Sequence, residues 1–407
     1  MVMFHLMKLN FIFRYILSIP CSPCRVKNKM THFYLKFFIY LSEYPRVLSM
    51  RIRPVPAADC RLLGGKGMSW KTALYDYLHA RNTAETEASA GVLANVVEDE
   101  RFNRETDARY RRLIESRKER GVKALRGEMR LKLQHVREHE EGVTADVECG
   151  RQFFYEQGGR ERKECIVIRE RVGLIRKGSR WRIAQISARE SEREKTKQPY
   201  SWLAEEGIYT PEGEISSSQP YLNYSILNHV GTYPETRKKL YDRARAVKYA
   251  DTWWNGYNPA FIEFEVDCTS YVSQCLFAGG SPMNYTGKRG AGWWYSGKQG
   301  SRELWSYSWA VAQALQLYVP ASRRGLTGTL VSSAAELRPG DFISYDWDGD
   351  GRFQHNTFVT ALDAGGMPLV NAHTVSSKHR YWDYKDSYAW TDKTRYAFVR
   401  VSDEMDG

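Results

Sequence analysis

Residues 267–280 read DCTSYVSQCLFAGG, and this stretch decides the architecture expected for the second half of the chain. Apolar side chains recur at helical spacing after Cys268, and Gly279 and Gly280, followed by Pro282, are typical of a helix end. The pattern predicts a helix that carries Cys268 in its first turn. Partial positive charge and free N–H groups at a helix N-terminus favour a thiolate over a thiol.

Two neighbours of Cys268 have simpler explanations. Asp267 stands at the N-cap position, so we expect its carboxylate to cap the helix, with an electrostatic role in a site as the alternative. Cys275 lies two turns further along the same face and is expected to be a buried packing residue.

A hairpin further along the chain supplies histidines. The segment HNTFVTAL (355–362) predicts a strand, the turn DAGGM follows, and PLVNAHT (368–374) predicts the returning strand. The five-residue turn sets the pairing of the strands: Leu362 opposite Pro368, Thr357 opposite His373 and Val359 opposite Asn371. His355 is then expected to be a diagonal neighbour of His373.

A thiol hydrolase needs at least a nucleophilic cysteine and a histidine that acts as its base, and here a cysteine at a helix start is followed by a histidine on a downstream strand. We predict Cys268 as the nucleophile and His355 as the base, with His373 orienting the imidazole and Asn371 as the alternative orienting group. Further candidates are Asn258, Tyr257 and Gln274 as oxyanion donors, Asp267 through its charge, and Trp293 and Trp294 as substrate contacts or, more simply, core residues.

The stretch DWDGDG, residues 346–351, matches the first half of a calcium-binding loop. Position twelve of that loop is Thr357 rather than glutamate, and the flanking segments are predicted strands. A polar turn is therefore expected, and the sequence predicts no metal ion and no cofactor. Seven cysteines at irregular spacing do not indicate a disulfide framework.

The formal net charge of +12 is distributed unevenly. Residues 1–67 contain eleven Lys and Arg side chains against two acidic ones, which gives +9 and leaves +3 for the other 340 residues. The remaining excess is too small to indicate a nucleic-acid partner. No uncharged run approaches the roughly 18 residues needed to span a bilayer, so no membrane partner is predicted.

Changes of pattern divide the chain into four parts. Residues 1–67 lack a helical or strand period and are expected to be a spurious or disordered leader, with an export segment or real structure as alternatives. Residues 68–190 predict two helices and then four antiparallel strands, an α+β accessory domain whose topology resembles the cone of the nuclear-transport-factor-like superfamily. Polar residues 191–223 predict a linker, and residues 224–403 a second α+β domain.

Residues 241–283, which contain DCTSYVSQC, together with residues 337–374 and RYWDY at 380–384, closely resemble the putative amidase domain family common in spore-forming Gram-positive bacteria. The resemblance covers about residues 241–401. It implies a papain-like fold related to CHAP amidases and bacterial wall endopeptidases, with the cysteine at a helix N-terminus packed on an antiparallel sheet.

By this resemblance Cys268 is the nucleophile, His355 the general base and then acid, and His373 the polar third member. Ser270 and Asn356 depart from the family pattern, which would have asparagine and a small residue there. The implied function is a cysteine-dependent amidohydrolase or peptidase that works through an acyl thioester, with peptidoglycan peptides as candidate substrates.

The alternative function is a papain-like module that binds wall or peptide ligands without turnover. In both cases the expected partner is a peptide or amide compound rather than a nucleic acid or a membrane. The lack of a clean signal peptide favours a cytoplasmic location, with secretion as the alternative. The sequence predicts no oligomeric state.

Overall fold

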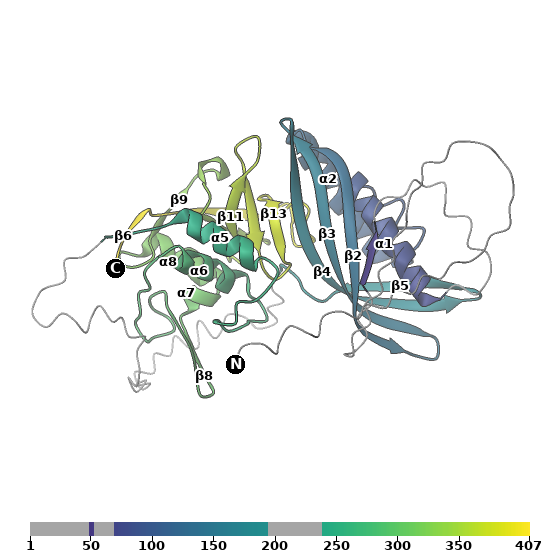
Figure 1. Ribbon diagram of the computed structural model, residues 1–407, viewed down its shortest axis with the longest axis horizontal. Helices are drawn as coiled ribbons and strands as arrows, with labels where there is room; N and C mark the ends of the chain where they lie inside the picture. The colour runs from purple at the N-terminus through teal and green to yellow at the C-terminus, as the bar shows by residue number, and fades with distance from the viewer. Residues whose placement is uncertain (1–48, 53–68, 194–237) are drawn as a thin grey trace, which may run out of the picture. The chain divides into compact units, whose positions relative to one another are not determined.

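The computed structural model of the protein describes residues 49–52, 69–193 and 238–407 (Figure 1). Of the leader predicted over residues 1–67, the described part is one strand, β1 (Ser49–Ile52), which pairs antiparallel with β2. All but the first three residues of the linker predicted over 191–223 lie outside the described residues. None of the helices among the described residues is long and apolar enough to cross a membrane.

Two helices and four strands follow one another in residues 69–193, as the change of sequence period predicts. Each helix begins at a capping side chain: Ser69 accepts a hydrogen bond from the N–H of Thr72, and Asp99 accepts one from the N–H of Phe102. The strands form the predicted antiparallel meander. These elements are α1 (Trp70–Glu87), α2 (Glu100–Glu119), β2 (Lys123–Glu138), β3 (Gly142–Gln157), β4 (Arg160–Lys177) and β5 (Arg180–Ala188).

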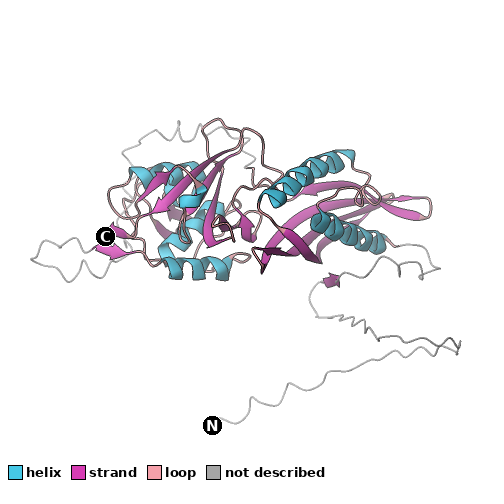
Figure 2. Ribbon diagram, turned by 90° about the horizontal axis from the view of Figure 1, so that it is seen from above, coloured by secondary structure: helices cyan, strands magenta, loops and turns pink. Residues whose placement is uncertain are grey.

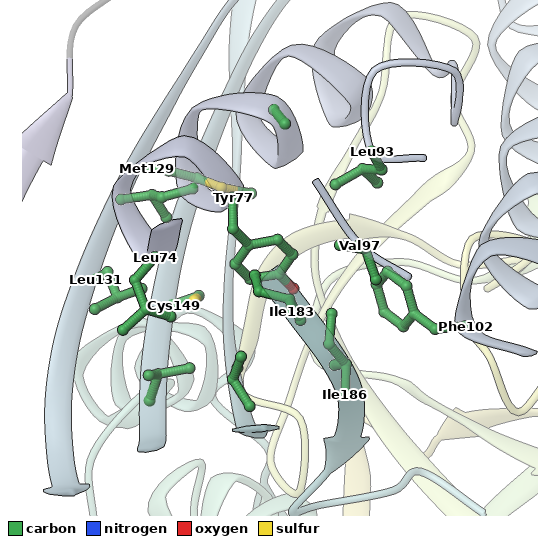
Figure 3. Packing of buried hydrophobic residues seen from close by; sticks show 14 of the residues in the cluster. Leu74, Tyr77, Leu93, Val97, Phe102, Met129, Leu131, Cys149, Ile183 and Ile186 are labelled. Atoms are coloured by element: carbon green, nitrogen blue, oxygen red, sulfur yellow. The ribbon is translucent and has the colours of Figure 1, made fainter. Parts of the chain in front are cut away.

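One face of this meander is apolar and carries α1. Side chains of β3 alternate between buried and half-buried along the whole strand. Met129, Leu131 and Cys149 of the strands pack with Leu74 and Tyr77 of α1 in one buried cluster (Figure 3). The helix therefore covers the apolar face that the period of two in the sequence predicts.

The same part of the chain also buries charged side chains. Glu85 accepts hydrogen bonds from Arg109 at 2.8 and 2.9 Å and from Arg151 at 2.5 Å. Burial alone would raise the pKa of Glu85, but the two guanidinium groups hold it well below its usual range. The carboxylate is therefore ionised and balances two buried cations.

Residues 238–407 mix short helices with short strands, whereas α1 and α2 are long helices beside long strands (Figure 2). The helix predicted within residues 241–254 is α5 (Arg243–Trp253), capped by Asp242, and the helix predicted from Cys268 is α6 (Cys268–Ala278). The remaining elements are β6 (Lys238–Leu240), β7 (Tyr295–Gln299), β8 (Arg302–Trp305), α7 (Tyr307–Ala310), α8 (Ala312–Ala321), β9 (Gly328–Val331), η1 (Ala334–Glu336), β10 (Phe342–Asp346), β11 (His355–Leu362), β12 (Pro368–Ala372), β13 (Ser377–Tyr381), β14 (Arg395–Val401) and β15 (Glu404–Asp406).

Most of the described strands form one antiparallel sheet, in the order β1-β2-β3-β4-β13-β12-β11-β10-β14-β9, with β5 paired to β4. Two apolar clusters pack on opposite faces of β10 and β11. Phe342 and Phe358 belong to the cluster that includes α6, and we call this the helix face. Tyr345 and Val359 belong to the other cluster, on what we call the far face.

The hairpin of β11 and β12 departs from its predicted pairing at one residue. Its five-residue turn is as predicted, but a β-bulge at Thr360 shifts the register beyond it. The observed pairs are Leu362–Pro368, Ala361–Leu369, Val359–Val370 and Phe358–Asn371. The predictions that Thr357 lies opposite His373 and Val359 opposite Asn371 were wrong. Because side chains alternate along a strand, this shift exchanges the residues of β11 that share a face with His373.

Candidate functional site

Cys268 is the first residue of α6, as predicted, and is 2 % exposed. Tyr271, Val272 and Cys275 are fully buried, so the helix packs on the core along its length. Burial raises the pKa of the Cys275 thiol well above its usual value. The expectation that Cys275 is a buried packing residue is confirmed. The sulfur of Cys268 lies 3.7 Å from the hydroxyl oxygen of Thr269.

Asp267 does not cap α6, so the capping prediction was wrong. Its backbone (φ −106°, ψ 2°) lacks the extended conformation of a capping residue, and its side chain makes no capping hydrogen bond. Instead, its Oδ2 lies 2.6 Å from Nδ1 of His373, the residue that follows β12. The structure thus joins the end of β12 to the residue directly before Cys268.

Both ring nitrogens of His373 are engaged. Nε2 lies 2.7 Å from the main-chain oxygen of Trp253, and Nε2 carries a hydrogen because a carbonyl oxygen only accepts. Nδ1 and the Asp267 carboxyl then share one further proton. The ring stacks on Tyr271 with centroids 4.0 Å apart, and Tyr257 packs on it edge-on at 5.4 Å. These contacts fix both the tautomer and the orientation of the imidazole.

The Asp267–His373 pair is buried, and burial changes the pKa of the carboxyl. Asp267 and His373 are 1 % and 4 % exposed. Burial raises the pKa of Asp267 above its usual value, and the contact with His373 opposes that rise. A carboxyl moved toward neutrality beside an imidazole is typical of groups that exchange protons.

His355 lies on the other side of the sheet. It pairs with Tyr345 across β10 and β11, and the rings of Tyr345, Trp347 and Tyr384 surround it at centroid distances of 5.6, 5.9 and 5.6 Å. The predicted proximity of His355 to His373 was wrong. Because of the bulge, the side chain of Asn356 rather than that of His355 lies on the helix face, where His373 lies. Burial lowers the pKa of His355 to about 3, so the ring is neutral near pH 7.

Asn371, the alternative orienting group, has a role within the sheet. Its Nδ2 donates to Asp251 at 2.9 Å, and its Oδ1 accepts from the hydroxyl of Thr360 and from the N–H of His379. The amide therefore links the bulge to β13 and α5, and its contacts do not include the His373 ring.

The candidate oxyanion donors are also engaged in local contacts. Asn258 donates to the hydroxyl of Tyr249 at 3.0 Å, and that hydroxyl donates to Gln274 at 2.7 Å. Gln274 in turn donates to Ser270 at 3.0 Å. This chain of side chains joins α5 to α6 and has a structural explanation. Tyr257 is 38 % exposed and contacts the His373 ring, which leaves it beside the site.

Trp293 and Trp294 are core residues, which agrees with the simpler of the two expectations and not with the alternative of substrate contacts. They are 0 % and 1 % exposed. The indole N–H of Trp293 donates to Ser273 of α6, and that of Trp294 donates to the main-chain oxygens of Lys288 and Ala291. Their indole rings pack inward because each N–H finds an acceptor there.

The acidic DWDGDG stretch forms the expected polar turn. The buried carboxylate of Asp346 accepts hydrogen bonds from the main-chain N–H groups of Asp348, Gly349 and Gly351. Both of its oxygens are thereby used inside the turn. Across residues 49–52, 69–193 and 238–407, no group of three or more His, Cys, Asp or Glu side chains is arranged to hold a metal ion.

Sequence reasoning missed two contributors to the site. The main-chain oxygen of Trp253 leaves no signature in a sequence, because every residue carries one. Asn356 donates from Nδ2 to the hydroxyl of Thr269 at 3.1 Å, next to Cys268. The signal available for Asn356 was its departure from the family pattern.

Comparison with known proteins finds a family model that matches this second part of the chain. Residues 240–399, which include Cys268, Asp267 and His373, match the model of the family described as "Putative amidase domain". The description of that family names an amidase, which is an enzyme that hydrolyses amide bonds.

A curated relative matches part of the chain. The uncharacterized protein YhbB of Bacillus subtilis (strain 168) is 52% identical over 164 residues, which are 40% of this chain and 51% of that protein. The chain therefore spans about half the length of the curated relative it matches. No solved structure matches the chain.

Proposed function

We propose that residues 240–399 hydrolyse an amide bond with Cys268 as the nucleophile. The observation that carries the proposal is the 2.6 Å contact between Asp267 and His373 directly beside Cys268 at the start of α6. A nucleophile, an imidazole and a carboxyl that orients the imidazole are the parts that acyl transfer needs. The match to an amidase family supports the class of reaction.

In the proposed mechanism Asp267 holds His373 through Nδ1, and Nε2 exchanges protons. Nε2 takes the thiol proton, and the sulfur of Cys268 attacks the carbonyl carbon of the amide. The oxyanion accepts a hydrogen bond from the main-chain N–H of Cys268. The C–N bond then breaks as Nε2–H protonates the leaving amine. A water molecule gives one proton to Nε2, adds its oxygen to the thioester carbonyl, and releases the acid and the thiol.

This mechanism requires a movement near α5. Nε2 must leave the Trp253 oxygen and release to water the hydrogen that it donates there before it can accept the thiol proton, and a sulfur that is 2 % exposed is closed to a substrate. Trp253 is the last residue of α5, and residues 254–267 connect it to α6. We propose that substrate displaces this connection, so the arrangement described above is the resting one.

We extend the proposal to the folds of the two parts and to the substrate. A helix that carries Cys268 on an antiparallel sheet supports a papain-like arrangement for this part. Two helices on a four-stranded meander support a cone-like accessory domain over residues 68–190. We propose peptides of the cell wall as substrates, because the putative amidase family that residues 241–401 resemble is related to bacterial wall endopeptidases.

One observation favours a second candidate function. Both nitrogens of His373 are engaged and Cys268 is buried, as expected of a papain-like module that binds a peptide without cleaving it. Turnover separates the two candidates, because only the hydrolase releases an amine.

The test is release of amine from a panel of small amides and purified wall peptides by the full chain. We expect Cys268→Ala to abolish release and His373→Ala to reduce it by on the order of 100-fold or more. His355→Gln should stay within about threefold of the unchanged protein at neutral pH, because its side chain lies on the far face. Activity that survives Cys268→Ala would contradict the nucleophile assignment.

A further inference from the structure

The buried amide of Asn356 is the feature of this site that the mechanism above leaves unused. The side chain is 0 % exposed, projects from β11 toward α6, and donates from Nδ2 to the hydroxyl oxygen of Thr269 at 3.1 Å. Among the described residues its Oδ1 has no hydrogen-bond partner. A buried acceptor without a partner carries a free-energy penalty that a purely structural side chain would avoid.

We propose that Asn356 is a positioning residue that directs the hydroxyl proton of Thr269 onto the sulfur of Cys268 and so stabilises the thiolate. The proposal rests on the proposed function of Cys268 as a nucleophile. It adds to the mechanism a hydrogen-bond donor that comes from a side chain rather than from the helix backbone.

The direction of the hydrogen bonds follows from their chemistry. The NH₂ group of an amide only donates, so the hydroxyl of Thr269 is the acceptor in its contact with Asn356. A hydroxyl that accepts in this way still has its own hydrogen to donate. The sulfur of Cys268 lies 3.7 Å from that oxygen, within the longer reach of hydrogen bonds to sulfur. The O–H of Thr269 can therefore donate to the atom that becomes negative.

Burial strengthens this arrangement. Cys268, Thr269 and Asn356 are 2 %, 1 % and 0 % exposed, so water does not compete for the hydroxyl. A donor that is itself polarised by accepting a hydrogen bond donates more strongly, and the effect is larger away from solvent. The amide of Asn356 thus donates to the hydroxyl of Thr269, and that hydroxyl donates to the sulfur of Cys268.

Other charged or titratable groups face this end of α6. Asp267 precedes the helix, His373 approaches from β12, Tyr257 packs on His373 from the connection to α5, and Asp251 of α5 binds Asn371. They are unchanged in the variants proposed below, so a difference between variants reports the hydroxyl and the amide.

The test is the pH dependence of iodoacetamide alkylation of Cys268, resolved by peptide mass spectrometry in the full chain. The midpoint pH reports the thiolate fraction and needs no turnover. We expect Thr269→Val to raise the midpoint by about 0.5 to 1 pH unit, where one unit corresponds to roughly 1.4 kcal/mol. Thr269→Ser keeps the hydroxyl and should restore the midpoint of the unchanged protein.

Asn356→Asp gives the sharper result. A carboxylate accepts where the amide donated, so the Thr269 proton turns away from the sulfur and a negative charge is added nearby. We expect a rise of more than about one pH unit. Thr357→Val is the matched control, because it removes a buried hydroxyl from the same strand on the far face, where Thr357 contacts Tyr345. Its midpoint should not move.

Two outcomes would overturn the proposal. If folded Thr269→Val and Asn356→Asp proteins both keep the original midpoint, the hydroxyl does not donate to the sulfur. If Thr357→Val shifts the midpoint as much as Thr269→Val does, the effect is general destabilisation. Either result leaves the amide-hydrolysis assay unaffected, so failure of this inference is distinct from failure of the proposed function.

Discussion

The far-face position of His355 makes a quantitative prediction about acid stability. An imidazole packed among Tyr345, Trp347 and Tyr384 stays neutral in the folded protein, whereas the same ring in the unfolded chain is exposed to water. Replacing it by His355→Gln removes a group that takes up a proton on unfolding. The folded protein should therefore lose stability on acidification more steeply with His355 than without it.

The magnitude follows from the two pKa values of the ring. Burial lowers the pKa of His355 from 6.5 to about 3, so between these values the unfolded chain binds a proton that the folded protein does not. Stability from this group is complete above the unfolded value and falls as the pH drops, by about 1.4 kcal/mol per pH unit. Between about pH 7 and pH 4.5 the loss amounts to about 2.5 kcal/mol.

The measurement is urea unfolding of the unchanged protein and of His355→Gln across this pH range. The difference between their free energies of unfolding should change by about 2.5 kcal/mol, because carboxylates titrate in both proteins and cancel. His139→Gln, at an exposed position of the first part, serves as the control and should show a nearly constant difference. A flat difference for His355→Gln would mean that the ring titrates normally in the folded protein, as expected of a base facing Cys268, and would refute its placement.

Three further predictions concern the site and the two cores. Asp267→Asn keeps a partner for Nδ1 of the imidazole but removes the charge. The rate of amide hydrolysis should therefore fall by about 100-fold or more, while the free energy of unfolding in urea changes by less than about 1 kcal/mol. Unchanged activity would contradict the role of Asp267. Glu85→Gln leaves two buried arginines without their shared carboxylate and should lower the free energy of unfolding by about 3 to 5 kcal/mol, against less than about 1 kcal/mol for Glu100→Gln in an exposed pair. Trp293→Ala should lower the free energy of unfolding, measured by heat or urea, by about 3 to 5 kcal/mol. A rise in KM at unchanged stability would instead indicate that Trp293 contacts the substrate.

The sequence predicted most elements because their signals are local. Gly279 and Gly280 mark the end of α6, and the period of two in residues 128–188 marks a meander whose apolar face α1 covers. Cys268 at a helix start was predictable for the same reason. Each of these features depends on residues close together in the chain.

The arrangement of the site was less predictable, because it depends on a shift of one residue in the pairing of β11 with β12. The bulge at Thr360 carries no glycine and no other sequence signal, and it is held by contacts of Asn371 with distant residues. It decides that Asn356 rather than His355 faces α6. The prediction that Asp267 caps α6 was wrong for a similar reason, a contact between residues far apart in the chain. The carboxylate binds His373, which lies 106 residues away in the sequence.

The closed position of Cys268 also bears on how the protein withstands oxidants. Peroxide converts a thiolate to sulfenic acid only where it reaches the sulfur, and this sulfur is 2 % exposed. Under the proposed mechanism, the connection that opens for a substrate would also shield this sulfur from oxidation. Oxidation by peroxide, like alkylation, would then depend on transient opening of this connection, and it should be faster during turnover than in an idle molecule.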